Sequence, residues 1–192
     1  MRKANAKDRL LTTAGQLFNE RGYSEVGINE IIKTAETAKA SFYQHFASKE
    51  ALCEAWLDAI HDRSEKGREN ILASSGDPCE KIANYFKTLE DYLVESNFRG
   101  CPFSNTATVT GESCCGIRKR VEDHKVSIRE FFQTLVAQFV ASKERAHEIG
   151  DRLFIIYSGA GSETQNVREM WPIQTARRAA VEICQAERKT KE

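Results

Sequence analysis

Apolar residues recur at three- and four-residue spacing along almost the whole chain, and the alternating pattern of a strand is scarce. Only three prolines and eleven glycines interrupt a sequence of 192 residues. With 41% hydrophobic residues, the chain has enough apolar surface to bury a core and is not expected to be disordered. The pattern predicts an all-α fold of about nine helices.

Composition narrows the class of protein further. The 28 basic and 28 acidic side chains cancel, which argues against a polybasic binder but allows a local basic patch. We expect no transmembrane helix, because no apolar run approaches about 18 residues, and no signal peptide, because the basic start lacks an apolar block. The six cysteines show no CxxC spacing, so free thiols, no metal and no other cofactor are expected. Together these features indicate a cytoplasmic protein.

Turn and capping residues predict where several helices begin and end. Arg21-Gly22 ends a first helix, and Ser48 is suited to cap a helix over residues 49–73. Asp77-Pro78 predicts another helix start, with aspartate as N-cap and proline at the first position. We place a domain boundary after residue 48. Residues 1–48 form the first domain and 49–192 the second, with helix 49–73 connecting them.

Residues 28–46, INEIIKTAETAKASFYQHF, predict two short amphipathic helices joined by a tight turn near Ala35. This is the layout of a helix-turn-helix, whose second helix enters the major groove of DNA. Phe42 and Phe46 would hold that second helix, about residues 38–45, on the rest of the domain. Its other face and its flanks supply the candidate DNA-binding residues: Thr37, Ala38, Lys39, Ser41, Tyr43, Gln44, His45 and Lys49.

Each polar candidate suits a particular part of DNA. Gln44 could bind adenine through two hydrogen bonds, and Lys39 could reach guanine or a phosphate. Tyr43, His45 and Lys49 suit phosphate oxygens, although Tyr43 could instead be core, His45 a helix cap and Lys49 a solvated charge. A basic arm that would assist non-specific attraction to DNA precedes the helices: Arg2, Lys3, Lys7 and Arg9.

The segments GYSEVGINEIIKTAETA and KASFYQHFASKEAL resemble the DNA-binding domain of the TetR family of transcriptional regulators, from about residue 8 to 57. The resemblance implies an all-helical dimer in which three N-terminal helices bind a DNA operator. The remaining helices would bind a small organic effector and dimerise, and the effector would release a repressor from DNA. The turn differs from the family pattern: Glu36-Thr37 replaces a common Gly-Val, and Ala38 a common Ser or Thr. Thr37 is therefore expected to cap the recognition helix.

The second domain contains a candidate ligand pocket. Residues 98–113, FRGCPFSNTATVTGES, resemble a segment found in one branch of the family, and they combine small polar groups with an aromatic residue, as a pocket wall requires. Neighbouring helices add aromatic stripes, which could equally be core, and one histidine, which could be structural. The candidate pocket residues are Tyr85, Phe86, Leu89, Cys101, Phe103, Asn105, His124 and Phe131.

The last two helices carry small and apolar residues suited to close helix packing, so a two-fold dimer interface is predicted there. Packing inside one chain is the competing interpretation. The candidate interface residues are Leu153, Phe154, Tyr157, Gly161, Ala176, Ala180 and Ile183.

The sequence therefore predicts a ligand-responsive regulator, most simply a repressor that binds a palindromic operator as a homodimer. One alternative is a regulator that senses oxidants or electrophiles through Cys101 or the Cys114-Cys115 pair, which lies near basic residues. Another is a helical binding module that never touches DNA. No enzyme is expected, because catalytic and phosphate-binding motifs are missing from the sequence.

Overall fold

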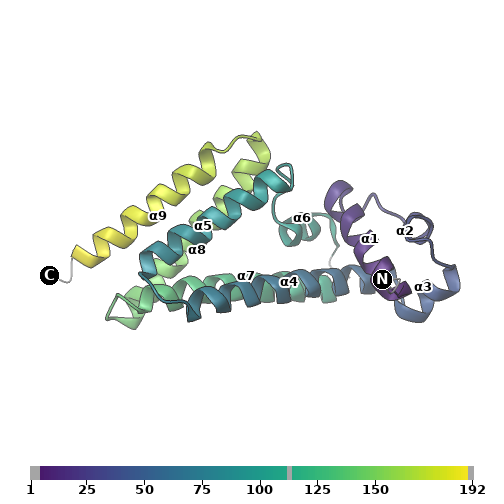
Figure 1. The fold of residues 1–192 in the computed structure, drawn as a ribbon, viewed down its shortest axis with the longest axis horizontal. Helices are drawn as coiled ribbons and strands as arrows, with labels where there is room; N and C mark the ends of the chain where they lie inside the picture. The colour runs from purple at the N-terminus through teal and green to yellow at the C-terminus, as the bar shows by residue number, and fades with distance from the viewer. Residues whose placement is uncertain (1–4, 112–113, 190–192) are drawn as a thin grey trace. The chain divides into compact units, whose positions relative to one another are not determined.

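The computed structural model describes residues 5–111 and 114–189. These residues form nine α-helices and no strand, so the prediction of an all-α fold is confirmed (Figure 1). The helices are α1 (Ala6–Arg21), α2 (Ile28–Thr34), α3 (Lys39–His45), α4 (Lys49–Ala73), α5 (Pro78–Glu95), α6 (Pro102–Val109), α7 (Cys115–Ala137), α8 (Lys143–Val167) and α9 (Trp171–Lys189).

The chain packs as two compact units. The first contains the residues up to Ser64 together with Pro102–His124, and the second contains Glu65–Cys101 and the residues from Lys125 onward. Helices α4 and α7 each contribute residues to both units. The two units are defined by packing contacts and not by function. The division into functional domains after residue 48 therefore stays a prediction.

In the first unit, α1 packs against both α2 and α3. Phe18 of α1, Ile31 of α2 and Phe42 of α3 are buried at this meeting of helices. The side chain of Asn5 caps α1 by accepting a hydrogen bond of 2.9 Å from the backbone N–H of Asp8. Gly22 ends α1 with a φ of 91°, a left-handed conformation that glycine adopts without steric cost. These features place α2 and α3 on a fixed support.

Helix α6 also belongs to the first unit. Its Phe103 is fully buried and stacks on the ring of His124 from α7, with ring centroids 3.7 Å apart. The hydroxyl of Ser24, in the connection after α1, donates to the carbonyl of Val109 at 3.4 Å. Residues far apart in the sequence therefore hold α6 in the same unit as the three N-terminal helices.

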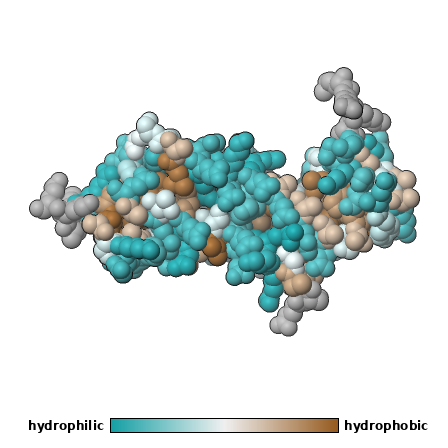
Figure 2. All heavy atoms as spheres, turned by 90° about the horizontal axis from the view of Figure 1, so that it is seen from below, coloured by the Kyte–Doolittle hydropathy of each residue, from teal (hydrophilic) through white to brown (hydrophobic). Residues whose placement is uncertain are grey.

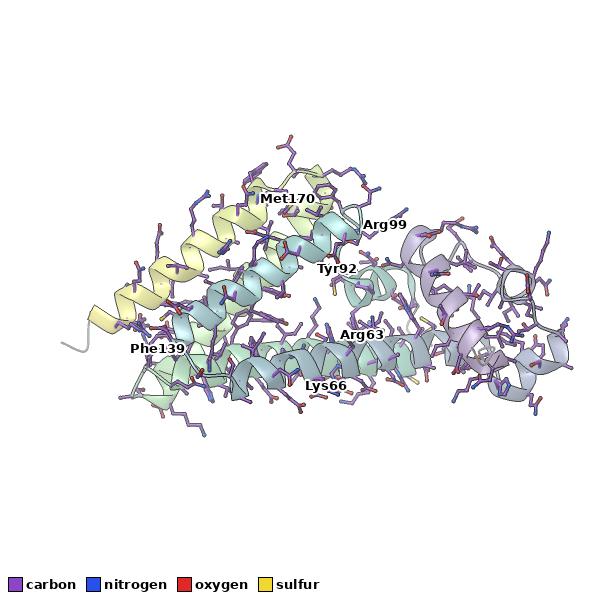
Figure 3. All side chains as sticks on the ribbon, in the orientation of Figure 1. Arg63, Lys66, Tyr92, Arg99, Phe139 and Met170 are labelled. Atoms are coloured by element: carbon purple, nitrogen blue, oxygen red, sulfur yellow. The ribbon has the colours of Figure 1, made fainter. Side chains whose placement is uncertain are left out.

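In the second unit, α5 packs against α8 and α9, and α8 packs against α9 (Figure 1). Its core contains an aromatic cluster in which ring centroids lie 4.6 to 5.8 Å apart. Tyr92, near the C-terminal end of α5, donates its hydroxyl to the carbonyl of Gly100 at 3.0 Å (Figure 3). The aromatic cluster consists of Tyr85, Phe86, Phe131, Phe132 and Tyr157.

Hydrophilic residues cover most of the face drawn in Figure 2. Among the described residues, no helix combines the length and apolar character needed to cross a membrane.

Asp77 caps α5 as predicted, and its removal should be measurable. One carboxylate oxygen accepts hydrogen bonds from the N–H groups of Cys79 at 2.6 Å and Glu80 at 3.3 Å, and the other pairs with Arg188 at 2.6 Å. The hydrogen bond with Arg188 is the main cause that lowers the pKa of Asp77. We expect Asp77→Ala to reduce the free energy of unfolding by about 1 kcal/mol in urea denaturation at neutral pH.

Asp77→Asn is the matched control for charge, since asparagine also caps helices well. Because the pKa of Asp77 is lowered by folding, its charge stabilises the protein above the pKa of an unfolded aspartate, about 3.9. That contribution is lost as the pH falls through the folded pKa. The difference in stability between the wild type and Asp77→Asn should therefore shrink in acid. A difference that stayed constant down to low pH would contradict this role of the charge.

Candidate nucleic-acid interface

Helices α2 and α3 form a helix-turn-helix (Figure 1). The second helix has one buried and one exposed face. Phe42 is fully buried and Phe46 is 5% exposed, so both hold α3 on the domain as predicted. The opposite face is open to solvent: Tyr43 is 50% exposed although it is a large aromatic residue. The exposed candidates on this face and its flanks are Ala38, Lys39, Tyr43, Gln44 and His45.

The entry into α3 differs from the prediction. Ala38 occupies the N-cap position and no side chain caps the helix there. Thr37 does not cap α3. Its hydroxyl instead donates to the carbonyl of Ile32 at 3.4 Å, because the turn directs this side chain back toward α2. Thr37 and Ser41 are partly buried, at the margin of the exposed face.

Lys49 is partly buried and makes contacts inside the domain. Its ammonium donates to the carbonyl of Tyr23 at 3.0 Å and to that of Val26 at 3.2 Å. It also lies 4.3 Å from the centroid of the Tyr23 ring, a cation–π geometry. Lys49 therefore ties the start of α4 to the connection between α1 and α2, and a phosphate contact stays a prediction.

The basic arm predicted at the N-terminus is only partly described. Arg2 and Lys3 lie outside the described residues, and Lys7 is exposed on α1. Arg9 is partly buried, and its guanidinium donates to the carbonyl of Ala35 at 3.1 Å and to that of Glu36 at 3.2 Å. Sequence analysis missed these contacts, because 26 or more residues separate the partners and no spacing pattern links them.

Arg120 is a second residue that sequence analysis missed. From α7 it pairs with two acidic residues of α4, with 3.2 Å to Glu54 and 2.8 Å to Asp58. It also donates to the carbonyl of Gly116 at 3.0 Å. All of these residues belong to the first unit, where Arg120 fastens α7 to the helix that follows α3.

The structure distributes the candidate pocket residues over both units. In the second unit, Tyr85, Phe86 and Phe131 are buried in the aromatic cluster, and Leu89 packs against the core. The partly buried Cys101 belongs to the same unit. The first unit contains the other three candidates: Phe103, Asn105 and His124. Their role as a pocket stays a prediction.

The candidate interface residues on α8 and α9 differ in how deeply they are buried. Leu153, Ala176 and Ala180 are buried against the core of the same chain, because α5, α8 and α9 close around them. Their role in a dimer interface stays a prediction. Tyr157 stacks on Tyr85 in the aromatic cluster. The remaining three candidates are only partly buried: Phe154, Gly161 and Ile183.

The cysteines named as candidate sensors differ in exposure. Cys101 is partly buried, and its sulfur lies 3.8 Å from the ammonium nitrogen of Lys125. Cys114 is partly buried and Cys115 is exposed. Within the described part of the chain, no group of three or more histidine, cysteine or acidic side chains is arranged to hold a metal ion.

The fold and the exposed surface define a class of protein. In this class, a helix-turn-helix domain with one polar helix face is followed by a larger helical unit. Residues 10–56 match the family model for bacterial regulatory proteins of the tetR family. The transcriptional repressor NemR of Escherichia coli is 33% identical over 115 residues, which cover 57% of this chain and 55% of NemR. The regulator LmrA of Bacillus subtilis is 26% identical over 153 residues, or 77% of this chain and 80% of LmrA.

Solved structures agree in fold. A TetR-family transcriptional regulator from Streptomyces coelicolor superposes with a TM-score of 0.86 at 23% identity, covering 95% of this chain and 96% of that one. The reduced form of E. coli NemR gives a TM-score of 0.80 at 22% identity, covering 93% and 97%. The match to the tetR family lies in the helix-turn-helix domain, residues 10–56, and the solved structures agree with the rest of the described chain in fold. In sequence, it spans about half the length of the NemR repressors it matches.

Proposed function

We propose that this protein is a transcriptional repressor that binds a palindromic DNA operator as a homodimer and is released by a small organic effector. The observation that carries the proposal is the exposed polar face of α3, with Lys39, Tyr43 and Gln44 open to solvent while Phe42 anchors the helix. A helix so exposed can enter the major groove and present these side chains to base edges and phosphates. The proposal includes action in the cytoplasm and no catalytic role.

The family relationship supports the same function, since NemR is named a transcriptional repressor and LmrA a transcriptional regulator. A homodimer suits the task, because two recognition helices must reach successive major grooves about 34–36 Å apart. An effector that couples to DNA binding with about 1–3 kcal/mol would change operator affinity about 5- to 150-fold. A thiol sensor remains the alternative, and the contact between Cys101 and Lys125 does not favour it over release by an effector.

Selection of bound sequences from a random DNA pool by the purified full-length chain tests this function. We expect enrichment of a palindrome with two half-sites, and no enrichment at low salt would contradict the proposal. Candidate effectors can then be screened for release of the selected duplex. If no small molecule changes affinity but peroxide does, and serine at Cys101 or Cys114 abolishes that response, the thiol alternative replaces the effector.

Substitution on α3 tests the interface itself. Gln44→Ala should weaken binding of the selected duplex by about 1–3 kcal/mol and relax the preference at one base pair of each half-site, because a bidentate contact to a base is removed. Fluorescence anisotropy with base-substituted duplexes measures both effects. Lys66→Ala, an exposed change on α4 in the second unit, is the control and should bind like the wild type (Figure 3). An unchanged preference at every base pair would remove Gln44 from the interface.

A further inference from the structure

The turn between α2 and α3 has a backbone conformation that usually requires glycine. The N–H of Glu36 donates to the carbonyl of Lys33 at 3.2 Å, and the N–H of Thr37 donates to that of Ile32 at 3.1 Å. This pair of hydrogen bonds defines a Schellman motif, in which the residue after the C-cap is left-handed and most often glycine. Here that residue is Glu36, with a φ of 50°. Its Cβ makes this conformation unfavourable for the isolated segment.

Arg9 supplies the contacts that hold this turn. Its guanidinium reaches from α1 and donates through Nε to the carbonyl of Ala35 at 3.1 Å and through Nη2 to that of Glu36 at 3.2 Å. The two carbonyls lie on either side of the left-handed residue, so the planar guanidinium fixes both peptide groups at once. A positive charge at the C-terminal end of α2 is also favourable for the helix dipole. Arg9 therefore stabilises the conformation that Glu36 disfavours.

The direction of α3 depends on this turn. Ala35, Glu36, Thr37 and Ala38 are all that separates α2 from α3, and no side chain caps the start of α3. We propose that Arg9 is a positioning residue that sets the orientation of the recognition helix, and with it operator affinity, without contacting DNA. This inference rests on the proposed function. It also changes the role of Arg9 from the non-specific DNA attraction that the sequence predicts.

A cycle of substitutions in the full-length protein tests the inference, with the duplex selected above as the probe. Arg9→Ala should weaken operator affinity about tenfold, because a smaller fraction of molecules holds α3 in the binding orientation. Glu36→Gly removes the need for the two hydrogen bonds from Arg9, since glycine adopts a positive φ freely. Adding Glu36→Gly to Arg9→Ala should therefore restore affinity to within about threefold of Glu36→Gly alone.

Arg9→Lys distinguishes positioning from phosphate binding. It retains the positive charge but lacks the planar fork that spans two carbonyls. Positioning predicts that Arg9→Lys binds nearly as weakly as Arg9→Ala and that neither changes the salt dependence of binding. Phosphate binding predicts that Arg9→Lys retains most of the affinity. It also predicts that Arg9→Ala lowers the slope of log affinity against log salt by about 0.9 for each phosphate no longer neutralised. The two results expected for phosphate binding would overturn the inference. A double variant that binds the operator as weakly as Arg9→Ala would also overturn it.

Hydrogen exchange of the free protein gives a readout that needs no DNA. The backbone amides of Glu36, Thr37 and the α3 residues should exchange about tenfold faster in Arg9→Ala, and Glu36→Gly should reverse this in the double variant. Exchange in α5 serves as the internal control for global unfolding and should not change. If the wild type selects no DNA, the proposed function fails, and the exchange measurement still decides the role of Arg9. Unchanged exchange at the turn and α3 in Arg9→Ala would refute it.

Discussion

Replacing Gly150 by alanine should lower the free energy of unfolding by about 3 kcal/mol, the upper range for adding one carbon to a well-packed core. Gly150 lies on α8 where it is buried against α7. A Cβ at this position would meet the Cα and the backbone nitrogen of Gln133 at 2.7 Å. These are backbone atoms, so no side-chain rotation can relieve the overlap, and α7 and α8 would have to move apart. Chemical denaturation followed by circular dichroism, at one fixed protein concentration, measures the change.

Gly67→Ala is the matched control for this experiment. Gly67 also lies inside a helix, α4, but it is exposed and an added Cβ would have no neighbour within 4 Å. Alanine is the better helix former, so Gly67→Ala should raise stability by about 0.5–1 kcal/mol. The two substitutions are chemically identical and are expected to act in opposite directions. If both stabilised the protein, the close approach of α7 and α8 at Gly150 would be wrong.

Truncating Phe132 to alanine should cost about 4 kcal/mol, within the range measured for buried phenylalanines. Phe132 is fully buried and lies 5.6 to 5.8 Å, between ring centroids, from four other rings of the aromatic cluster. Its removal leaves a cavity that those rings cannot all close. Thermal and urea unfolding of the variant measure the loss, and Val94→Ala, at a position 59% exposed, should change stability by less than about 0.5 kcal/mol.

The Phe132→Ala result also bears on the predicted pocket. The aromatic stripes of α5 and α7 have two interpretations from the sequence, a core or the lining of a ligand cavity. Truncating a side chain that lines a solvent-filled cavity sacrifices little dispersion energy, whereas truncating one in a closed core sacrifices much more. A loss of stability below about 1 kcal/mol would therefore favour a cavity around Phe132. A loss near about 4 kcal/mol would assign Phe132 to the core.

Local signals in the sequence were sufficient for the helices. Asp77 and Pro78 mark the start of α5, and Ser48 accepts a hydrogen bond of 3.0 Å from the N–H of Ala51 at the start of α4. Period-3.6 patterning assigned the buried face of α3, because Phe42 is the residue that periodicity places against the domain. Such features depend on residues a few positions apart, which is why one sequence reveals them.

Contacts between distant segments could not be predicted in the same way. The sequence presents Arg9 and Lys49 as cations available to DNA, yet both donate to backbone carbonyls of the helix-turn-helix domain. Likewise, Leu153 and Ala180 have the same apolar or small character whether they face a second chain or the interior of their own. The type of a residue predicts that its side chain will be buried. Only the tertiary structure determines which segment the side chain packs against. One departure did carry a signal: Glu36 stands where the turn favours glycine.

The placement of α6 has a mechanical consequence. The stacking of Phe103 on His124 and the hydrogen bond from Ser24 to Val109 make this short helix part of the body that also carries α1, α2 and α3. If the segment after α5 binds an effector, as the sequence predicts, then the effector site includes a helix from the same packing unit as the DNA-binding helices. An effector that displaced α6 would therefore act on the same packing unit that contains α3.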